Sequence, residues 1–342
     1  MLQQNVSLKP YNTFGIDVTA KQYAVFNNVE ELQTLLSVVD KSNILPLGGG
    51  SNLLFTSEVY NGTVLKNNIK GIEIVDETID HLYVKAGSGE VWHQFVLFCI
   101  QNNYAGIENL SLIPGCVGAS PMQNIGAYGV EIKDVFHSLE AYHIFDNTLV
   151  TFGLNDCDFG YRESVFKRKF KNQFIISSVT FKLSKTPQFK TGYGAIREEL
   201  ENMGVQELSI RAISDAVINI RSSKLPNPVE IGNAGSFFKN PVVSFTHYET
   251  LKTAYPEMPG YDVFEDETPV GKKLAAGWLI EKAGWKGFRR NDAGVHKLQA
   301  LVLVNYADAK GAEILDLSTK IIEDIYSKFQ VRLEREVNII GA

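Results

Sequence analysis

Residues 44 to 55 read Ile-Leu-Pro-Leu-Gly-Gly-Gly-Ser-Asn-Leu-Leu-Phe, a short apolar strand that runs into three consecutive glycines and leaves through a second apolar run. A strand that ends in glycines exposes successive backbone N–H groups in a concave turn, and such turns bind phosphate without needing a lysine. The turn therefore predicts a cradle for a pyrophosphate group, made by Gly48, Gly49, Gly50, Ser51 and Asn52.

Strands and helices alternate around this turn. Residues 21 to 26 are a predicted strand, and Asn28 with Glu31 three residues later can cap the helix that follows. Apolar side chains then recur with helical spacing up to residue 39. The first part of the chain is therefore predicted to mix short strands with helices.

The pattern becomes rich in strands between residues 72 and 183. The predicted elements are a strand at 81 to 86, a helix at 91 to 101, a hairpin at 139 to 152 around Asp146-Asn147 and a strand at 173 to 183. A long stretch of small residues, 113 to 129, separates the helix from the hairpin. It has too many glycines for a helix and too few charges for a disordered linker, so we expect a packed loop that lies against a ligand.

The obvious competing fold is a Rossmann dinucleotide-binding domain. No Gly-x-Gly-x-x-Gly follows the first strand, and the turn Gly87-Ser88-Gly89 continues into Val91-Trp92 without the third glycine of that fingerprint. A Rossmann site is therefore not expected. Each of the three glycine-rich segments could by itself be only a tight turn, but three in succession favour a ligand site.

Composition excludes several classes of protein. The net charge of −6 without a long basic run argues against a nucleic-acid partner. Three widely spaced cysteines suggest neither a disulfide framework nor a zinc site, and thus a reducing compartment. The N-terminus lacks the pattern of a signal peptide, and no apolar run is long enough to span a bilayer. We expect a cytoplasmic protein with no metal ion and no membrane partner.

The C-terminal third is predicted to form another mixed unit. A helix at 210 to 220 leads into Arg221 and Lys224, whose cations could simply complement the helix dipole at a solvated helix end. A strand at 299 to 305, a helix at 312 to 329 and a last strand at 331 to 340 complete the chain.

Three further strings carry most of the functional information. Residues 232 to 241 read Gly-Asn-Ala-Gly-Ser-Phe-Phe-Lys-Asn-Pro, residues 160 to 164 read Gly-Tyr-Arg-Glu-Ser, and residues 333 to 341 read Leu-Glu-Arg-Glu-Val-Asn-Ile-Ile-Gly. Alone, the first would be best interpreted as a glycine-rich turn before a strand. Together, and in their order along the chain, the three strings resemble the active-site strings of the UDP-N-acetylenolpyruvoylglucosamine reductase (MurB) family, the flavoenzymes of bacterial cell-wall precursor synthesis.

The resemblance runs nearly end to end, from the string at 11 to 15 to Gly341. It implies an α+β architecture, with the two-subdomain FAD-binding fold of the vanillyl-alcohol-oxidase and MurB superfamily and a third α+β domain for the substrate. The implied boundaries are 1 to 67 with a returning strand at 331 to 342, then 68 to 221, then 222 to 330. A Thr-Gly-Tyr-Gly loop at 191 to 194 places the chain with the long-form, type I enzymes.

The resemblance also assigns binding residues. Besides the 48 to 52 turn, the implied FAD contacts are Ser120, Pro121, Gln123, Asn124, Gly126 and Ala127, with noncovalent FAD and with NADPH as co-substrate. The implied contacts to the substrate, UDP-N-acetylglucosamine enolpyruvate, are Tyr193, Arg221, Lys224, Asn240, Tyr261 and Gln299, with Lys282 a weaker match. Cys116 departs from the family, which usually has threonine there, and this puts one flavin hydrogen bond in question.

The chemistry implied by the resemblance is reduction of an enolpyruvyl double bond by hydride from flavin N5. Ser236 is the expected proton donor, and Arg162 and Glu336 are placed beside the substrate carboxylate and the developing enolate. A carboxyl group in that position implies a raised pKa for Glu336. Glu334 is the competing candidate, and a solvated strand edge is the simpler interpretation of both glutamates.

Two other classes of function remain open from the sequence. A flavin oxidase or dehydrogenase of the same superfamily would usually tether its flavin through a histidine or cysteine, and none of the six histidines lies in a matching loop. A nucleotide-binding regulatory module would show no flavin reduction by NADPH. We expect the reductase, acting as a monomer.

Overall fold

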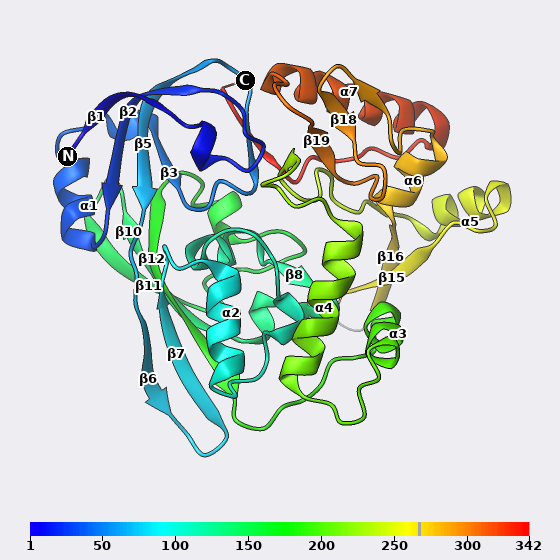
Figure 1. The fold of residues 1–342 in the computed structure, drawn as a ribbon, viewed down its shortest axis with the longest axis horizontal. Coiled ribbons are helices and arrows are strands. Elements are labelled where there is room, and N and C mark those ends of the chain that lie inside the picture. The colour runs from blue at the N-terminus through cyan, green and yellow to red at the C-terminus, as the bar shows by residue number, and fades with distance from the viewer. Residues whose placement is uncertain (266–267, 342) are drawn as a thin grey trace. The chain divides into compact units, whose positions relative to one another are not determined.

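The computed structural model describes residues 1–265 and 268–341, and the chain divides into two compact units (Figure 1). Unit 1 contains residues 1–6, 19–50 and 59–223, and unit 2 contains residues 7–18, 51–58 and those from 224 onward. Both units combine helices with sheets, which confirms the predicted α+β class. Within the described residues, every helix is too short or too polar to cross a bilayer.

Unit 1 contains a four-stranded sheet in the order β1-β2-β5-β3, formed by β1 (Gln3–Ser7), β2 (Thr19–Phe26), β5 (Val59–Asn67) and β3 (Ile44–Leu47). β5 pairs in parallel with both β2 and β3. Helix α1 (Val29–Leu36) buries three leucines of its apolar face against this sheet. The Asn28 side chain caps the helix by accepting a hydrogen bond of 2.8 Å from the Glu31 N–H, as predicted.

The second sheet of unit 1 is antiparallel in the order β11-β10-β12-β7-β6, formed by β11 (Thr148–Gly153), β10 (Phe136–His143), β12 (Phe174–Ser184), β7 (His81–Gly87) and β6 (Ile72–Glu77). β10 and β11 confirm the predicted hairpin, and Asn147 takes the positive φ of 56° at its turn. Helix α2 (Trp92–Gln101) packs on one face, where Phe95 lies 5.0 Å from the ring of Phe181.

Short elements complete unit 1. They are the helices α3 (Gly194–Asn202) and α4 (Ile210–Lys224), the hairpin strands β8 (Gly126–Ala127) and β9 (Val130–Glu131), and the 3-10 helices η2 (Lys41–Asn43), η3 (Glu108–Leu110), η4 (Val117–Ala119), η5 (Pro121–Gln123), η6 (Ile132–Asp134) and η7 (Val165–Lys167). The predicted loop at 113 to 129 thus consists of two single-turn helices, a two-residue strand and turns. α4 reaches Lys224, four residues beyond the prediction, so Arg221 lies inside it.

Unit 2 contains three small sheets. They are formed by β13 (Gly232–Asn233), β19 (Leu303–Asn305), β18 (Ala293–Val295) and β17 (Arg289–Arg290); by β14 (Val242–Val243), β16 (Thr268–Leu274) and β15 (Gly260–Glu265); and by β20 (Asn338–Ile340) with β4 (Leu53–Phe55). The other elements are η1 (Lys9–Tyr11) and the helices α5 (Phe245–Ala254), α6 (Ala276–Lys282) and α7 (Gly311–Phe329). α7 buries the isoleucine and leucine face that its sequence predicts.

The last predicted strand, 331 to 340, is wrong in its length. Only residues 338 to 340 form a strand, which pairs in parallel with β4. Just before it, Arg335 makes an isolated antiparallel bridge to Phe238. The segment therefore changes its pairing partner between residues 335 and 338, and this change interrupts a regular strand.

Candidate functional site

The three glycine-rich segments of unit 1 meet, and together they are called the glycine cradle below (residues 48–50, 87–89 and 113–129). A Cβ atom added to Gly49 would lie 2.8 Å from the Cα of Gly115, and one added to Gly118 would lie 2.5 Å from the Cβ of Ser88. Contacts this short require glycine. The close approach of the backbones explains why glycines recur in all three segments.

Backbone hydrogen bonds hold two of these segments together. The Gly118 N–H donates to the Ser88 carbonyl at 2.9 Å, and the Val117 N–H donates to the Glu90 carbonyl at 2.9 Å. The single-turn helix at 117 to 119 is therefore fixed against the turn at 87 to 89. A rigid backbone surface can present N–H groups to an anion without reorganisation.

Two lysines support the cradle from β5 and the loop that follows it. Lys66 Nζ donates to the Gly48 carbonyl at 2.7 Å, and the Lys70 ammonium donates to the carbonyl of Gly89. Burial lowers the pKa of Lys66 below its ordinary value. Sequence reasoning missed both lysines because a glycine turn needs none, although a lysine near the end of a largely buried strand (Lys66) and one just after it (Lys70) were a usable signal. Their charge favours an anionic ligand on the cradle.

The atoms that line the cradle suit a nucleotide cofactor such as FAD. Ser88 Oγ is buried and finds no hydrogen-bond partner within the described residues, whereas most buried hydroxyl groups have one. Gly50 adopts a φ of 62°, which only glycine adopts at little cost and which aids a concave turn. An unpaired buried hydroxyl beside a backbone cradle suits a ligand that brings its own polar atoms.

In the loop at 113 to 129, the side chains mostly form hydrogen bonds that stabilise the loop itself. Both amide hydrogens of Asn124 are used, because Nδ2 donates to Glu131 Oε2 at 2.9 Å and to the Gly160 carbonyl at 3.1 Å. Ser120 Oγ donates to the Val117 carbonyl at 2.7 Å. Any contact of these two residues to a cofactor would thus rely mainly on their backbones. The other expected contacts lie in η5, which contains Pro121 and Gln123, and in β8, which contains Gly126 and Ala127.

Arg162 lies beside this loop. Its Nη2 donates to the Gly126 carbonyl at 2.6 Å, and its guanidinium lies 5.3 Å from the centre of the Tyr161 ring. Its backbone φ of 55° is uncommon for a residue other than glycine. An uncommon backbone conformation that directs a cation at a glycine-rich loop is typical of a functional position.

Arg221 and Tyr193 are joined through Tyr128 in unit 1. The charge of the Arg221 guanidinium interacts with the Tyr128 side chain, and the Tyr128 ring packs edge-on against Tyr193, with the ring centres 5.4 Å apart. Burial lowers the pKa of Arg221, and α4 continues past it to Lys224, so Arg221 is not the last residue of the helix. Lys224, at the end of the same helix, is exposed, and for it both interpretations stand.

In unit 2, Ser236 and Glu336 lie on paired backbone segments. The Glu336 N–H donates to the Phe237 carbonyl at 2.8 Å. Asn52 Nδ2 donates to the Glu336 carbonyl at 3.4 Å, so the end of the Gly48 to Asn52 turn contacts the same segment. Ser236 itself is exposed and follows Gly235, whose φ of 69° turns the chain.

The two candidate glutamates differ in their surroundings. The Glu334 carboxylate is exposed and lies 3.4 Å from Lys239 Nζ. Glu336 is half-buried. The difference favours Glu336 as the functional carboxylate, since an exposed paired glutamate is the ordinary case.

Asn240 and Gln299 flank the start of α6. Asn240 Oδ1 accepts a hydrogen bond of 2.9 Å from the Ala276 N–H. Gln299 Oε1 accepts from the Leu301 N–H at 3.3 Å and would lie 3.2 Å from a Cβ added to Gly277. The structure therefore brings these two predicted residues to one helix end.

Tyr261 and Lys282 are not brought together. The Lys282 ammonium lies 2.8 Å from Glu257 and near the rings of Tyr255 and Trp278, an exposed surface arrangement. Tyr261 is 59% exposed on β15, and Lys273 is its direct partner on β16. Lys273 is thus the cation beside Tyr261, and the strand register that reveals it was not available from the sequence.

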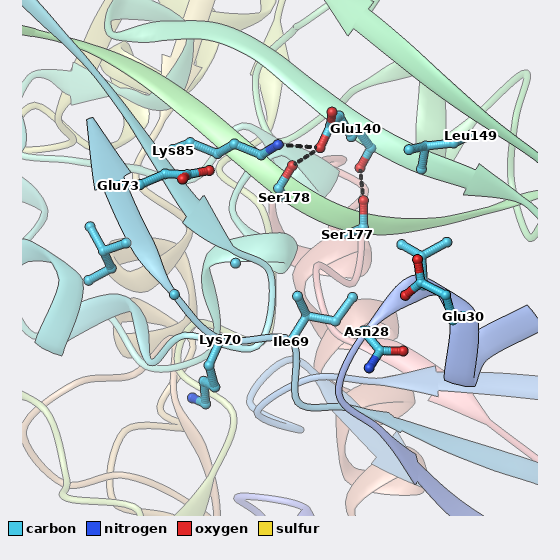
Figure 2. Close-up of a pocket in the computed structure, with 14 residues that line it drawn as sticks. Asn28, Glu30, Ile69, Lys70, Glu73, Lys85, Glu140, Leu149, Ser177 and Ser178 are labelled. Atoms are coloured by element: carbon cyan, nitrogen blue, oxygen red, sulfur yellow. Dashed lines mark hydrogen bonds and ion pairs between the residues drawn. The ribbon is translucent and has the colours of Figure 1, made fainter. Parts of the chain in front are cut away.

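A cavity of about 440 Å³ adjoins the turn at 87 to 89, since Gly87 and Lys70 are among the residues that line it. Figure 2 shows Lys85 and Ser178 pointing toward Glu140 at one side of this cavity, where both contacts measure 2.7 Å. These polar groups satisfy one another. The cavity therefore offers a ligand few unpaired groups and does not compete with the glycine cradle.

Two models of known protein families match separate parts of the chain. Residues 20–153 match the family model of an FAD binding domain, and residues 227–340 match the C-terminal domain of UDP-N-acetylenolpyruvoylglucosamine reductase. The first range contains the whole glycine cradle, and the second contains Ser236 and Glu336.

Full-length relatives carry the same name. The chain is 49% identical over 340 residues to UDP-N-acetylenolpyruvoylglucosamine reductase of Flavobacterium johnsoniae and 48% identical over 341 residues to that of Amoebophilus asiaticus, with 99% of both chains covered in each case. The crystal structure of the reductase (MurB) from Thermus caldophilus has a similar fold, with a TM-score of 0.69 at 22% identity and 99% of both chains covered.

Proposed function

The chain belongs to the UDP-N-acetylenolpyruvoylglucosamine reductase family of FAD-binding oxidoreductases, and from this we propose that it reduces UDP-N-acetylglucosamine enolpyruvate to UDP-N-acetylmuramate with NADPH. The reaction would supply peptidoglycan precursors in the cytoplasm and so support cell shape and division. Identity of nearly one half over the whole chain is the observation that carries this proposal.

The glycine cradle would hold FAD noncovalently, with the pyrophosphate on the backbone N–H groups of residues 48 to 50 and Lys66 behind them. When bound, FAD supplies the hydride that is added to the substrate double bond and takes its own electrons from NADPH. The FAD-binding subdomains would be residues 1 to 67 and 68 to 221, and the substrate domain residues 222 to 330.

Ser236 would deliver the proton. Addition of hydride to one carbon leaves an electron pair on the neighbouring carbon, conjugated with the substrate carboxylate, and a proton from Ser236 Oγ then forms the second C–H bond. An exposed serine can recover its proton from solvent. The exposure of Ser236 and the positive φ of the preceding Gly235 support this role.

Arg162 and Glu336 would stabilise the charge that develops before protonation. A guanidinium matches the geometry of a carboxylate and remains charged, so Arg162 suits the substrate carboxylate. Glu336 must carry a proton, or act through a water molecule, to stabilise an enolate. Its half-buried position supports this role.

The substrate would be bound by cations and aromatic rings around this centre. Arg221 and Lys224 would bind its pyrophosphate, and Tyr193 would cover it. Asn240, Gln299 and Tyr261 would contribute the remaining contacts, with Lys273 next to Tyr261. A monomer would suffice for this chemistry.

The test is a visible spectrum of the purified protein, followed by NADPH oxidation with and without the enolpyruvyl sugar. We expect a flavin spectrum, fast NADPH oxidation only with the sugar, and a product heavier by two hydrogen atoms in mass spectrometry. Rapid NADPH oxidation by oxygen together with an unchanged sugar would instead favour a flavin oxidase.

A further inference from the structure

Leu112 has a backbone conformation that its own residue type disfavours. Its φ of 58° lies in the left-handed region, where a bulky side chain is uncommon and costs free energy. Its N–H donates to His93 Nδ1 at 3.0 Å, and its carbonyl accepts from Arg221 Nε at 3.3 Å. Side chains therefore hold Leu112 through both its N–H and its carbonyl group, and one of them, Arg221, is a proposed substrate ligand.

The contacts continue from Arg221 to Tyr193. The Arg221 charge interacts with the Tyr128 side chain, and the Tyr128 ring packs edge-on against Tyr193. Asn109 is fully buried, and its Nδ2 donates to the Tyr128 carbonyl at 3.0 Å and to the Lys190 carbonyl at 2.9 Å. The same amide thus ties the Tyr128 turn to the segment that leads to Tyr193.

We propose that His93, on α2, is a positioning residue for substrate binding, which acts through the Leu112 peptide to hold Arg221 and thereby the Tyr128 and Tyr193 rings. The inference rests on the proposed function, because it assumes that Arg221 and Tyr193 contact the substrate. His93 itself would touch neither substrate nor cofactor. Its task is to keep a strained backbone in the one conformation that directs the Arg221 side chain.

The hydrogen bond fixes the protonation state of His93. Nδ1 accepts the Leu112 N–H only when it carries no proton, so the ring is neutral with its proton on Nε2. Burial, and then the charge of Arg221, lower the pKa of His93 below its ordinary value. α2 contains no other titratable side chain except Cys99, whose pKa is raised by burial, so Arg221 on α4 is the charge that acts on the ring.

The test compares His93→Ala with His93→Asn, whose side-chain oxygen can replace Nδ1 as an acceptor. We expect His93→Ala to raise KM for the enolpyruvyl sugar about tenfold, because a buried N–H loses its acceptor. kcat, the amount of bound flavin and the limiting rate of flavin reduction at saturating NADPH should change little. His93→Asn should restore most of the KM, and amide hydrogen exchange at Leu112 should be fast only in His93→Ala.

Acidification should give the same result in the unaltered protein. As the pH falls through the lowered pKa of His93, the ring gains a proton, loses its acceptor and repels Arg221, so KM should rise more steeply than in His93→Asn. An unchanged KM in His93→Ala, or no rescue by His93→Asn, would overturn the inference. If the unaltered protein does not reduce the sugar at all, the proposed function fails instead, and Leu112 exchange still reports on the contact.

Discussion

The glycine cradle and the segment around Ser236 form their proposed ligand surfaces in different ways. In the cradle the backbone forms the surface, since Gly49 and Gly118 are packed too tightly for any side chain. Around Ser236 the side chains form it, because an exposed serine and a half-buried glutamate project from paired segments. A surface formed by the backbone can be recognised in the sequence by its glycines, whereas a catalytic serine or glutamate has no distinctive local pattern.

The largest effect of a single substitution is expected at Ser236, on the surface formed by side chains. Ser236→Ala removes the proposed proton donor, so reoxidation of the reduced flavin by the enolpyruvyl sugar should slow by about 10²–10⁴-fold. Flavin content and flavin reduction by NADPH should stay close to normal, as measured by stopped-flow absorbance of the two half-reactions. Thr253→Ala, which removes another exposed hydroxyl of unit 2, should change neither rate. An equal loss in both half-reactions would assign the serine to holding flavin or nicotinamide instead.

The two glutamates sharpen the comparison on the side-chain surface. Glu336→Gln should slow reoxidation by about 10- to 10³-fold, since an amide donates a weaker hydrogen bond to the developing enolate than a protonated carboxyl group does. Glu334→Gln should have little effect, because its exposed carboxylate pairs with Lys239. The same stopped-flow assay separates the two variants. A larger loss in Glu334→Gln would reverse the assignment.

The sequence predicts helices and strands well where local residues, or pairing with a single strand, determine the element. The hairpin at Asn147, the Asn28 cap and the apolar face of α7 all follow from local patterns. The strand predicted at 331 to 340 fails because its first part pairs with Phe238 and its last part with β4. Local propensity contains no information about such a change of partner.

The candidate site shows the same division. The three glycine-rich segments were identified separately, but only the structure shows that they pack on one another and that Lys66 and Lys70 support them. The sequence offered Lys282 only as a weaker match, and Lys273 could not be placed beside Tyr261 because strand register cannot be derived from the neighbours of that lysine in the sequence.

In the glycine cradle, a substitution at Gly49 is expected to weaken FAD binding. Gly49→Ala would place a Cβ atom 2.8 Å from the Cα of Gly115, a backbone atom that cannot move aside as a side chain can. Overpacking of this kind costs about 1–3 kcal/mol, so FAD affinity should fall by about five- to 150-fold while the protein still folds. Flavin retained after gel filtration measures the loss. Gly153→Ala, which brings a Cβ no closer than 3.4 Å to Asp156, should remain fully yellow. Retention of flavin by Gly49→Ala would remove this turn from the cofactor site.

The smallest effect is expected at Lys224, where the structure leaves two interpretations open. If its exposed ammonium binds the pyrophosphate of the substrate, Lys224→Ala removes a charged hydrogen bond worth about 1.5–3 kcal/mol, and KM for the enolpyruvyl sugar should rise by about tenfold to a hundredfold. kcat should change little, because the pyrophosphate is bound equally in the ground state and the transition state. Lys282→Ala is the matched control, since that exposed lysine is already paired with Glu257 and should leave KM unchanged. Steady-state kinetics of both variants at low ionic strength decide the matter, because screening by salt weakens exposed contacts. Equal KM values in the two variants would return Lys224 to the role of a solvated helix end, and Arg221 would then be the main cation available in α4 for the pyrophosphate.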